Sequence, residues 1–207
     1  MNFHSIGYSL IFIAIAYIMG AFPTGYLLVR ALKGEDLRKI GSGSTGATNV
    51  KRVLGSWAFF VVMFIDAVKG ILPVVLAKYV EVKFNLFPHS HILPVLASVA
   101  VIIGHSKSLF LGFKGGKSVA SGVGTIFGLY WPVGLITALL WSIITYSTKI
   151  VSISSIIAVL LTPLWMWLFK QPLSYVIYCL IGGLYITWLH RENIQRLIAG
   201  TENKVRK

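Results

Sequence analysis

The chain has 207 residues, of which 56% are hydrophobic and 12% are charged, against roughly 25% charged residues in an average soluble domain. Its 19 Lys and Arg residues outnumber its 6 Asp and Glu residues, which gives a formal net charge of +13. A nucleic-acid-binding protein of this basicity would be more hydrophilic, so no nucleic-acid partner is expected. Because one helical crossing needs roughly 20 apolar residues, the composition predicts a single integral membrane domain over residues 1–207.

Neither a metal nor a cofactor is expected. The single cysteine, Cys179, lies in an apolar run, which excludes an intrachain disulfide and a thiolate cluster and predicts a buried thiol. The acidic residues are too few and too scattered for the aspartate-rich magnesium site of many phospho-transfer enzymes. They are Glu35, Asp36, Asp66, Glu81, Glu192 and Glu202.

Seven apolar segments predict an all-α polytopic membrane helix bundle. They cover residues 6–32, 53–77, 86–103, 118–131, 133–146, 150–169 and 173–189. The first is too long for a cleaved signal peptide and has no basic residue ahead of it, so it is expected to remain as the first crossing. The fourth and fifth correspond to only ~21 Å of helix each, short of a ~30 Å hydrocarbon core. Five crossings plus a re-entrant pair are therefore the alternative.

Seven and five crossings are both odd numbers. If the fourth and fifth segments do not cross the membrane, every other loop therefore stays on the same side of it. Fifteen of the 19 basic residues follow the first, third, fifth and last segments, and only three lie on the opposite side. By the positive-inside rule the basic side is cytoplasmic and the N-terminus is outside. Asp66 and Lys69 lie within the second segment, where charge is costly unless paired. Two interpretations of Asp66 and Lys69 are equally compatible with the sequence: a functional pair and a structural ion pair.

The first basic-side loop has the composition of an anion-binding segment. Residues 41–49 read GSGSTGATN, and their glycines free the backbone to turn its N–H groups inward. Lys51 and Arg52 are expected to open the second helix, where the helix dipole also favours negative charge. The simpler interpretation is a polar linker with a helix cap. The side chains that add donors are Ser42, Ser44, Thr45, Thr48 and Asn49.

The second basic-side loop, residues 104–122, contains the elements of a phosphate cradle. Its core from Lys114 to Ser118 reads KGGKS and resembles a nucleotide-binding P-loop, but position 111 is Leu, so the Walker spacing fails and ATP hydrolysis is not indicated. A glycine turn, two ammonium groups and a helix start still suit a phosphate. A lysine cluster at the membrane surface is the competing interpretation. The glycines and small residues from Ser118 to Gly128 favour close helix packing over a ligand site.

The third basic-side segment, residues 190–202, reads HRENIQRLIAGTE. If the helix continues, His190 and Asn193 lie one turn apart on one face, with Arg196 next along it. His190 suits a hydrogen bond to phosphate or proton transfer near neutral pH, although a lone interfacial histidine more often has no such role. No role is expected for the outer-side histidines, which are His4, His89 and His91.

In order, GSGSTGATN, GH followed by FKGGKSVAS, and HRENIQRLIAGTE resemble the three cytoplasmic motifs of the bacterial acyl-phosphate:glycerol-3-phosphate acyltransferases. The resemblance covers essentially the whole chain, and FIDAVKGILP at residues 64–73 also looks like a family feature. It implies an enzyme of the bacterial cytoplasmic (inner) membrane whose active site faces the cytoplasm. Its reaction would move a fatty acyl group from acyl phosphate to the sn-1 hydroxyl of glycerol 3-phosphate, giving lysophosphatidic acid and phosphate, the first step of phospholipid synthesis.

The resemblance also implies residue roles. The catalytic residues would be Ser42, Arg52, Lys114, His190 and Asn193. The substrate-binding residues would be Gly43, Ser44, Thr45, Asn49, His105, Gly115, Gly116, Lys117, Ser118 and Arg191. Glu202 matches an acid that is linked to structural integrity more than to chemistry.

The chemistry of the residues agrees with this resemblance. Both substrates carry phosphate, which Arg52, Lys114 and Lys117 would bind through charge-assisted hydrogen bonds. Acyl phosphate is already activated, so positioning and oxyanion stabilisation suffice without a covalent acyl-enzyme. The hydroxyl proton has two candidate acceptors, the departing phosphate and His190. The phosphate is favoured, because His190 has no obvious carboxylate partner beyond Glu192.

The acyl chain must reach the bilayer lipids, and the two short helices with their glycines are expected to leave a lateral groove for it. Two other functions stay open. A transporter for phosphate or glycerol phosphate predicts matched repeats and broken helices at mid-membrane, and no such repeat is evident in the sequence. A non-enzymatic subunit of a lipid-synthesis assembly is the third interpretation.

Overall fold

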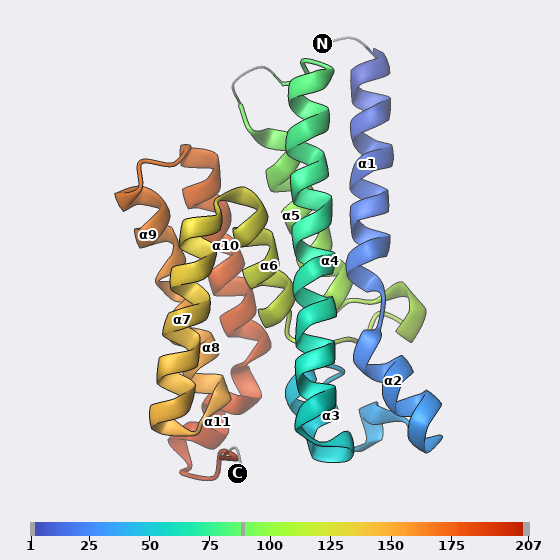
Figure 1. Cartoon of the computed structure of the whole chain (residues 1–207), viewed down its shortest axis with the longest axis vertical. Helices are drawn as coiled ribbons and strands as arrows, with labels where there is room; N and C mark the ends of the chain where they lie inside the picture. The colour runs from blue at the N-terminus through green and yellow to red at the C-terminus, as the bar shows by residue number, and fades with distance from the viewer. Residues whose placement is uncertain (1–2, 88–89, 205–207) are drawn as a thin grey trace.

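The computed structural model describes residues 3–87 and 90–204, which form helices and no β-strand. Figure 1 shows them as an all-α bundle, with the start of α1 and the end of α11 at opposite ends. In chain order the α-helices of these residues are α1 (Phe3–Ala21), α2 (Thr24–Lys33), α3 (Ala47–Leu54), α4 (Ser56–Lys83), α5 (Ile92–Ser106), α6 (Val119–Leu129), α7 (Trp131–Thr148), α8 (Val151–Leu160), α9 (Thr162–Leu168), α10 (Leu173–Leu189) and α11 (Arg191–Ile198).

Five helical segments of the described residues are long and apolar enough to cross a membrane. A sixth is obtained if α10 and α11, which are bent by 61° relative to each other, count as one. The chain is therefore a multi-pass, all-helical membrane protein, as predicted. The five segments are Ile6–Lys33, Ser56–Lys83, Ile92–Leu111, Trp131–Thr148 and Val151–Leu168.

The prediction of two short neighbouring helices is wrong for one of them. Helix α7 has 18 residues and is long enough to span, whereas α6 has 11. The extra turn of α7 contains Ser147 and Thr148, whose hydroxyls donate to the carbonyls of Ile143 and Ile144 one turn earlier. Because these polar groups are satisfied within the helix, α7 continues beyond the apolar run.

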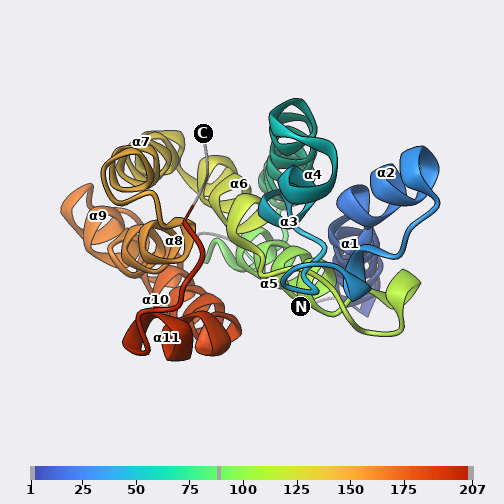
Figure 2. The ribbon, with the colours of Figure 1, turned by 90° about the horizontal axis from the view of Figure 1, so that it is seen from below.

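The short helix α6 lies between α4 and α7 (Figure 2). At Gly124 a Cβ atom would collide with the carbonyl of Ala67 on α4, so glycine permits the close approach of the two backbones. Lys78 of α4 donates to the carbonyls of Gly128 and Leu129, at 3.4 and 3.1 Å. These bonds satisfy carbonyls that a helix ending within a bilayer would otherwise leave unpaired. The expected packing role is confirmed for the glycines of α6, whereas the small residues Ser118 and Ala120 of the same stretch line a cavity.

The expectation that Lys51 and Arg52 open the second membrane helix is wrong. They lie in the last turn of α3, a separate helix of 8 residues. Gly55, with a φ of 87°, ends α3 and turns the chain into α4. A non-glycine residue adopts such a backbone conformation only with strain, so the break is built into the sequence at this position.

The buried side chains form clusters between the helices rather than one continuous core. One cluster joins α4, α5, α6, α7, α9 and α10 and includes Cys179, which is only 2% exposed, so the predicted buried thiol is confirmed. Another fixes α2, α3 and the start of α4 through Val29, Val50 and Val62. The second cluster holds the first motif loop against the end of the bundle.

Candidate active site

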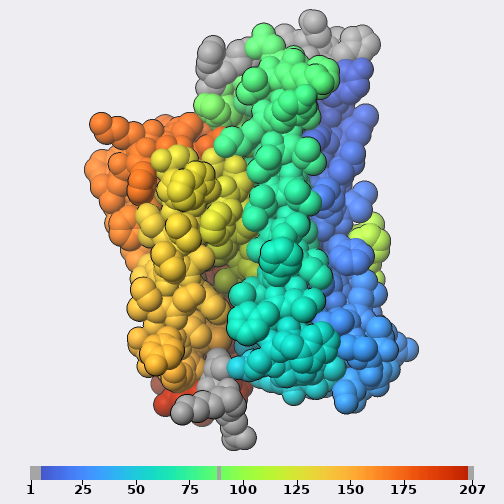
Figure 3. All heavy atoms as spheres, viewed as in Figure 1, coloured from blue at the N-terminus to red at the C-terminus, as the bar shows by residue number. Residues whose placement is uncertain are grey.

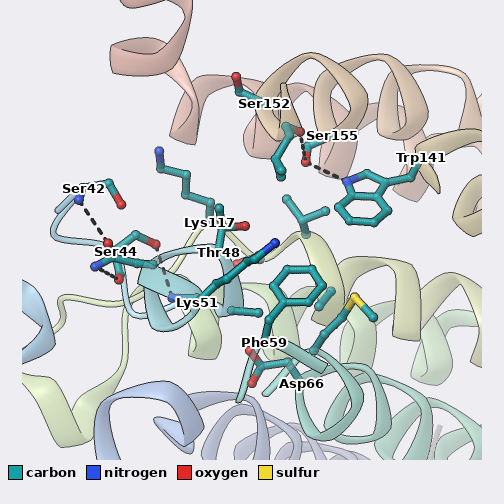
Figure 4. A pocket seen from close by; sticks show the side chains of 18 of the residues that line it. Ser42, Ser44, Thr48, Lys51, Phe59, Asp66, Lys117, Trp141, Ser152 and Ser155 are labelled. Atoms are coloured by element: carbon teal, nitrogen blue, oxygen red, sulfur yellow. Dashed lines mark hydrogen bonds between the residues drawn. The ribbon is translucent and has the colours of Figure 1, made fainter. Parts of the chain in front are cut away.

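A cavity of about 810 Å³ lies at the end of the bundle that carries α3 and α11. Figure 4 shows its polar side chains arriving from several segments that are far apart along the chain. The three motif segments therefore meet at one site. The predicted site residues that line it are Ser42, Ser44, Asn49, Arg52, His105, Lys117, Ser118, His190 and Asn193.

The other predicted site residues are not part of this lining. The side chain of Lys114 is exposed, and so is that of Arg191, whose guanidinium stacks 4.7 Å from the ring centre of Trp188. Thr45 is buried outside the cavity wall. The remaining residues in this group are the three glycines Gly43, Gly115 and Gly116.

Asn49 folds the first motif loop. Its side chain is buried, and its Oδ1 accepts hydrogen bonds from the backbone N–H of Ser42 and from Nη1 of Arg52, both at 3.2 Å. One amide thus holds the loop and directs Arg52 to the cavity. Its Nδ2 donates at 2.9–3.2 Å to the carbonyls of Leu37, Ile40 and Ser44.

The second motif is folded around His105, at the end of α5. The backbone N–H of Gly116 donates to the carbonyl of His105 at 3.1 Å, and a Cβ on Gly116 would collide with the imidazole ring. Glycine is therefore required for this approach. Ser118 donates from Oγ to the carbonyl of Ile102 at 2.7 Å, which closes the loop onto α5. The result is a tight turn that presents Lys117 to the cavity.

The third motif begins at the bend between α10 and α11. His190 lies at the bend, so the helix does not continue as expected, yet His190 and Asn193 both line the cavity. Nδ1 of His190 lies 2.8 Å from the carbonyl of Ile186. Because a carbonyl only accepts, Nδ1 carries the hydrogen, and Nε2 of the neutral ring keeps its lone pair.

A chain of hydrogen bonds joins the second and third motifs. Nζ of Lys117 donates to Oδ1 of Asn193, and Nδ2 of Asn193 donates to Oε1 of Glu202 at 2.5 Å. The same oxygen accepts from Oγ of Ser152 at 2.9 Å, while Oε2 pairs with Nε of Arg196 at 2.7 Å. The chain fixes the orientation of the Asn193 amide and ties the C-terminal segment to α8 and α11.

The charges around the cavity leave a positive surplus. Burial lowers the pKa of Lys117 below the usual value of a lysine, and the charge of Arg196 lowers it further. Burial alone would raise the pKa of Glu202, but hydrogen bonds from Asn193, Arg196 and Ser152 bring it below its ordinary value. Glu202 is therefore ionised and neutralises Arg196. The basic side chains that line the cavity are Lys51, Arg52, Lys117 and Lys204.

One side of the cavity is apolar, and no sequence motif pointed to it. Trp141 of α7 lies on this wall, and its Nε1 donates to Oγ of Ser155 on α8 at 3.1 Å (Figure 4). The helical spacing of these residues is that of any buried helix face, so only the serines within an apolar segment offered a signal. The C-terminal Asn203 and Lys204 were missed as well. The other apolar lining residues include Phe59, Met63, Val123 and Phe127.

The outer-side histidines do not reach the cavity as far as the structure describes them. The ring of His91 packs edge-on against Tyr175, at 5.5 Å between centroids. His89 lies outside the described residues, as does the side chain of His4.

A family model described as glycerol-3-phosphate acyltransferase matches residues 10–200. Glycerol-3-phosphate acyltransferases of Trichormus variabilis and Parasynechococcus marenigrum are 43% and 47% identical to this chain over 206 and 197 residues. These matches cover 93% and 95% of this chain and 90% of each relative.

Two crystal structures of PlsY (YgiH), an integral membrane glycerol 3-phosphate acyltransferase, are also similar. The glycerol 3-phosphate form has a TM-score of 0.87 and 34% identity, covering 96% of both chains. The lysophosphatidic acid form has a TM-score of 0.85 and 33% identity, covering 96% of this chain and 95% of that chain.

Proposed function

Because this chain belongs to the glycerol-3-phosphate acyltransferase family, we propose that its cavity is the active site where a fatty acyl group is joined to glycerol 3-phosphate. The protein is a membrane acyltransferase, and lysophosphatidic acid is its product. Acyl phosphate is the donor, and inorganic phosphate is released, at the first step of phospholipid synthesis. The observation that carries the proposal is the meeting of three remote motifs around one cavity that is cationic at one end and apolar along one side.

Residues 1–207 form one domain with seven crossings, the N-terminus outside and the C-terminus in the cytoplasm. The short helix α6 and the helix α10 complete this count beside the five longer segments. The motif loops lie at the end of the bundle where α11 lies (Figure 1), and most basic residues of the sequence belong to the loops of this side. By the positive-inside rule the active site therefore faces the cytoplasm from the bacterial inner membrane.

The two substrate phosphates bind at the cationic end. Arg52 and Lys117 contribute charge-assisted hydrogen bonds, while Ser42 and the backbone N–H groups of residues 41–49 and 114–118 surround the remaining oxygens. Lys114 is exposed at the second motif, and its flexible side chain turns onto the phosphate when substrate binds. No metal is required, since these groups themselves neutralise the negative charge of the phosphates.

The sn-1 hydroxyl attacks the acyl carbonyl, so an ester C–O bond forms as the anhydride C–O bond to phosphate breaks. Arg52, Lys117 and Asn193 stabilise the charge that develops on the oxygens. Nε2 of His190 is free to accept a hydrogen bond from the attacking hydroxyl, because Nδ1–H is held by Ile186. No hydrogen bond to a carboxylate supports the His190 ring within the described residues, so the proton passes to the departing phosphate.

The acyl chain lies along α6, between α4 and α7, with Met63 and Trp141 on facing walls. Figure 3 shows the molecular surface hollowed between these two helices. The short, glycine-rich α6 leaves this lateral groove open to the bilayer lipids, which suits a substrate whose tail stays in the membrane.

The test is an assay of the purified full chain with glycerol 3-phosphate and each of three donors: synthetic acyl phosphate, acyl-CoA and acyl carrier protein. We expect lysophosphatidic acid and one equivalent of phosphate from acyl phosphate alone. Product from acyl-CoA or acyl carrier protein in place of acyl phosphate would overturn the donor assignment. Uptake of phosphate into liposomes without any lysophosphatidic acid formed would overturn the assignment as an enzyme and favour a transporter.

A further inference from the structure

Asp66 and Lys69 of α4 form a buried ion pair that the chemistry above does not use. Their charged atoms lie 2.7 Å apart, and their side chains are 3% and 8% exposed. Burying two charges is costly, and charged residues inside a membrane segment point to a function. The two residues are not equivalent, because Asp66 lines the substrate cavity and Lys69 does not.

Lys69 holds the break between α1 and α2. Its Nζ donates at 2.9 Å to the carbonyl of Phe22, directly before Pro23. On the far side of the break, Oγ1 of Thr24 donates to Oδ1 of Asp66 at 3.2 Å. The ion pair thus anchors the broken first segment to α4, and this part of its role is structural.

Asp66 also faces His105. Its Oδ1 lies 3.9 Å from Nδ1 of His105, which is too far for a hydrogen bond but close enough for the carboxylate to attract the N–H dipole of a neutral imidazole in a buried setting. The imidazole is itself buried, and Nδ1 has no hydrogen-bond partner among the residues that the structure describes. The carboxylate therefore favours the ring orientation and tautomer that place the Nδ1–H toward Asp66.

The orientation of His105 in turn shapes the second motif. Its ring packs against Gly116, and its carbonyl accepts the N–H of the same residue. A Cβ on Gly115 would collide with that carbonyl, so the turn is in contact with His105 on two successive residues. Lys117 follows directly and donates to Asn193. A rotation of the imidazole would therefore displace Lys117.

We propose that Asp66 is a positioning residue of the acyl transfer, which acts through His105 to hold the Gly115–Lys117 turn and the Lys117 ammonium at the substrate phosphate. This inference rests on the proposed function. It assigns the two members of the ion pair different roles, with Lys69 serving the fold and Asp66 serving both the fold and turnover.

The informative variant is Asp66→Asn/Lys69→Met, which removes both charges together. Asp66→Asn alone would strand the Lys69 charge in the interior and destabilise the fold. We expect the double variant to fold with a lowered melting temperature, because the Lys69 anchor to the carbonyl of Phe22 is lost, while kcat falls about tenfold. Wild-type kcat in the folded double variant would overturn the proposal and leave a purely structural pair.

A coupling measurement tests the path through His105. We expect His105→Gln to lower kcat in the unmodified protein but to add little in the double-variant background, because both changes release the same turn. Independent, multiplicative losses would overturn the path. Glu81→Gln is the matched control, since Glu81 is another buried acid of α4 and accepts the N–H of Leu93 at 2.7 Å. It should lower the melting temperature and leave kcat unchanged.

Asp66→Glu covers the case in which the double variant does not fold. It keeps the charge but moves the carboxylate by one methylene, so we expect a folded protein with lowered kcat and an unchanged KM for glycerol 3-phosphate. Full kcat in this folded variant would refute the positioning role. An unmodified protein that makes no lysophosphatidic acid would instead refute the proposed function, so the two failures are distinguishable.

Discussion

The cavity has a cationic end and an apolar wall, and the two are built in different ways. At the cationic end, hydrogen bonds fix individual atoms. Arg52 donates to Asn49, and Lys117 donates to Asn193. Along the apolar wall, Met63 and Trp141 contribute surface and shape from long helices. The cationic end should therefore govern the rate with every substrate, whereas the wall should govern only which acyl chains fit.

The strongest test of the cationic end is Arg52→Ala. We expect kcat/KM for glycerol 3-phosphate to fall about 100-fold, because a charge-assisted donor to the reacting phosphate is lost. The loss should be the same for short and long acyl phosphates, measured as lysophosphatidic acid formed. Arg30→Ala is the control, since Arg30 donates to the carbonyl of Gly34 and does not line the cavity. A loss that depended on acyl length would contradict the separate roles of the cationic end and the apolar wall.

The two lysines of the second motif differ in whether they line the cationic end of the cavity. We expect Lys117→Ala to lower kcat/KM about 50-fold and Lys114→Ala about tenfold, because Lys117 lines the cavity whereas Lys114 is exposed. Steady-state kinetics of both variants under identical conditions measure the difference. The reverse order would mean that the turn reorganises around bound substrate and that Lys114 is the closer ligand.

For the apolar wall, the test is Met63→Trp beside Phe64→Trp. Met63 lines the cavity, whereas the neighbouring Phe64 is 68% exposed on the outside of α4. The larger side chain at Met63 should narrow the groove, so kcat/KM falls about fivefold for long-chain acyl phosphates and little for short ones. Phe64→Trp should change neither. Equal losses for all chain lengths at Met63 would contradict the acyl groove.

The smallest expected effect concerns alkaline pH. The pKa of Lys117 is lowered by burial, so its ammonium loses its proton at a lower pH than an ordinary lysine. Activity should therefore decline on the alkaline side as pH rises through this lowered value. Lys117→Arg keeps its charge and should move that decline to higher pH, even if its rate at neutral pH is reduced. An unchanged alkaline limb would show that another group titrates there.

The sequence was informative where chemistry is local. Glycines, hydroxyls and basic residues within a few positions of one another marked the loop of Ser42 and the turn before Ser118, and both reach the cavity. The ends of the helices were harder to predict from the sequence. The length of α7 depends on hydroxyls that bond within the helix, and the separation of α3 from α4 depends on the backbone angle of Gly55.

The membrane-helix class and the three loops that carry phosphate-binding groups could be predicted from the amino-acid sequence, because hydropathy and loop composition are properties of short stretches of chain. The packing of the helices was needed to see how those loops share one cavity, which helices form its apolar wall and why Asp66 faces His105. These contacts join α4 to α5, α6 and α7 across many residues of sequence. They depend on backbone approach at glycines and on buried polar pairing, which no local pattern encodes.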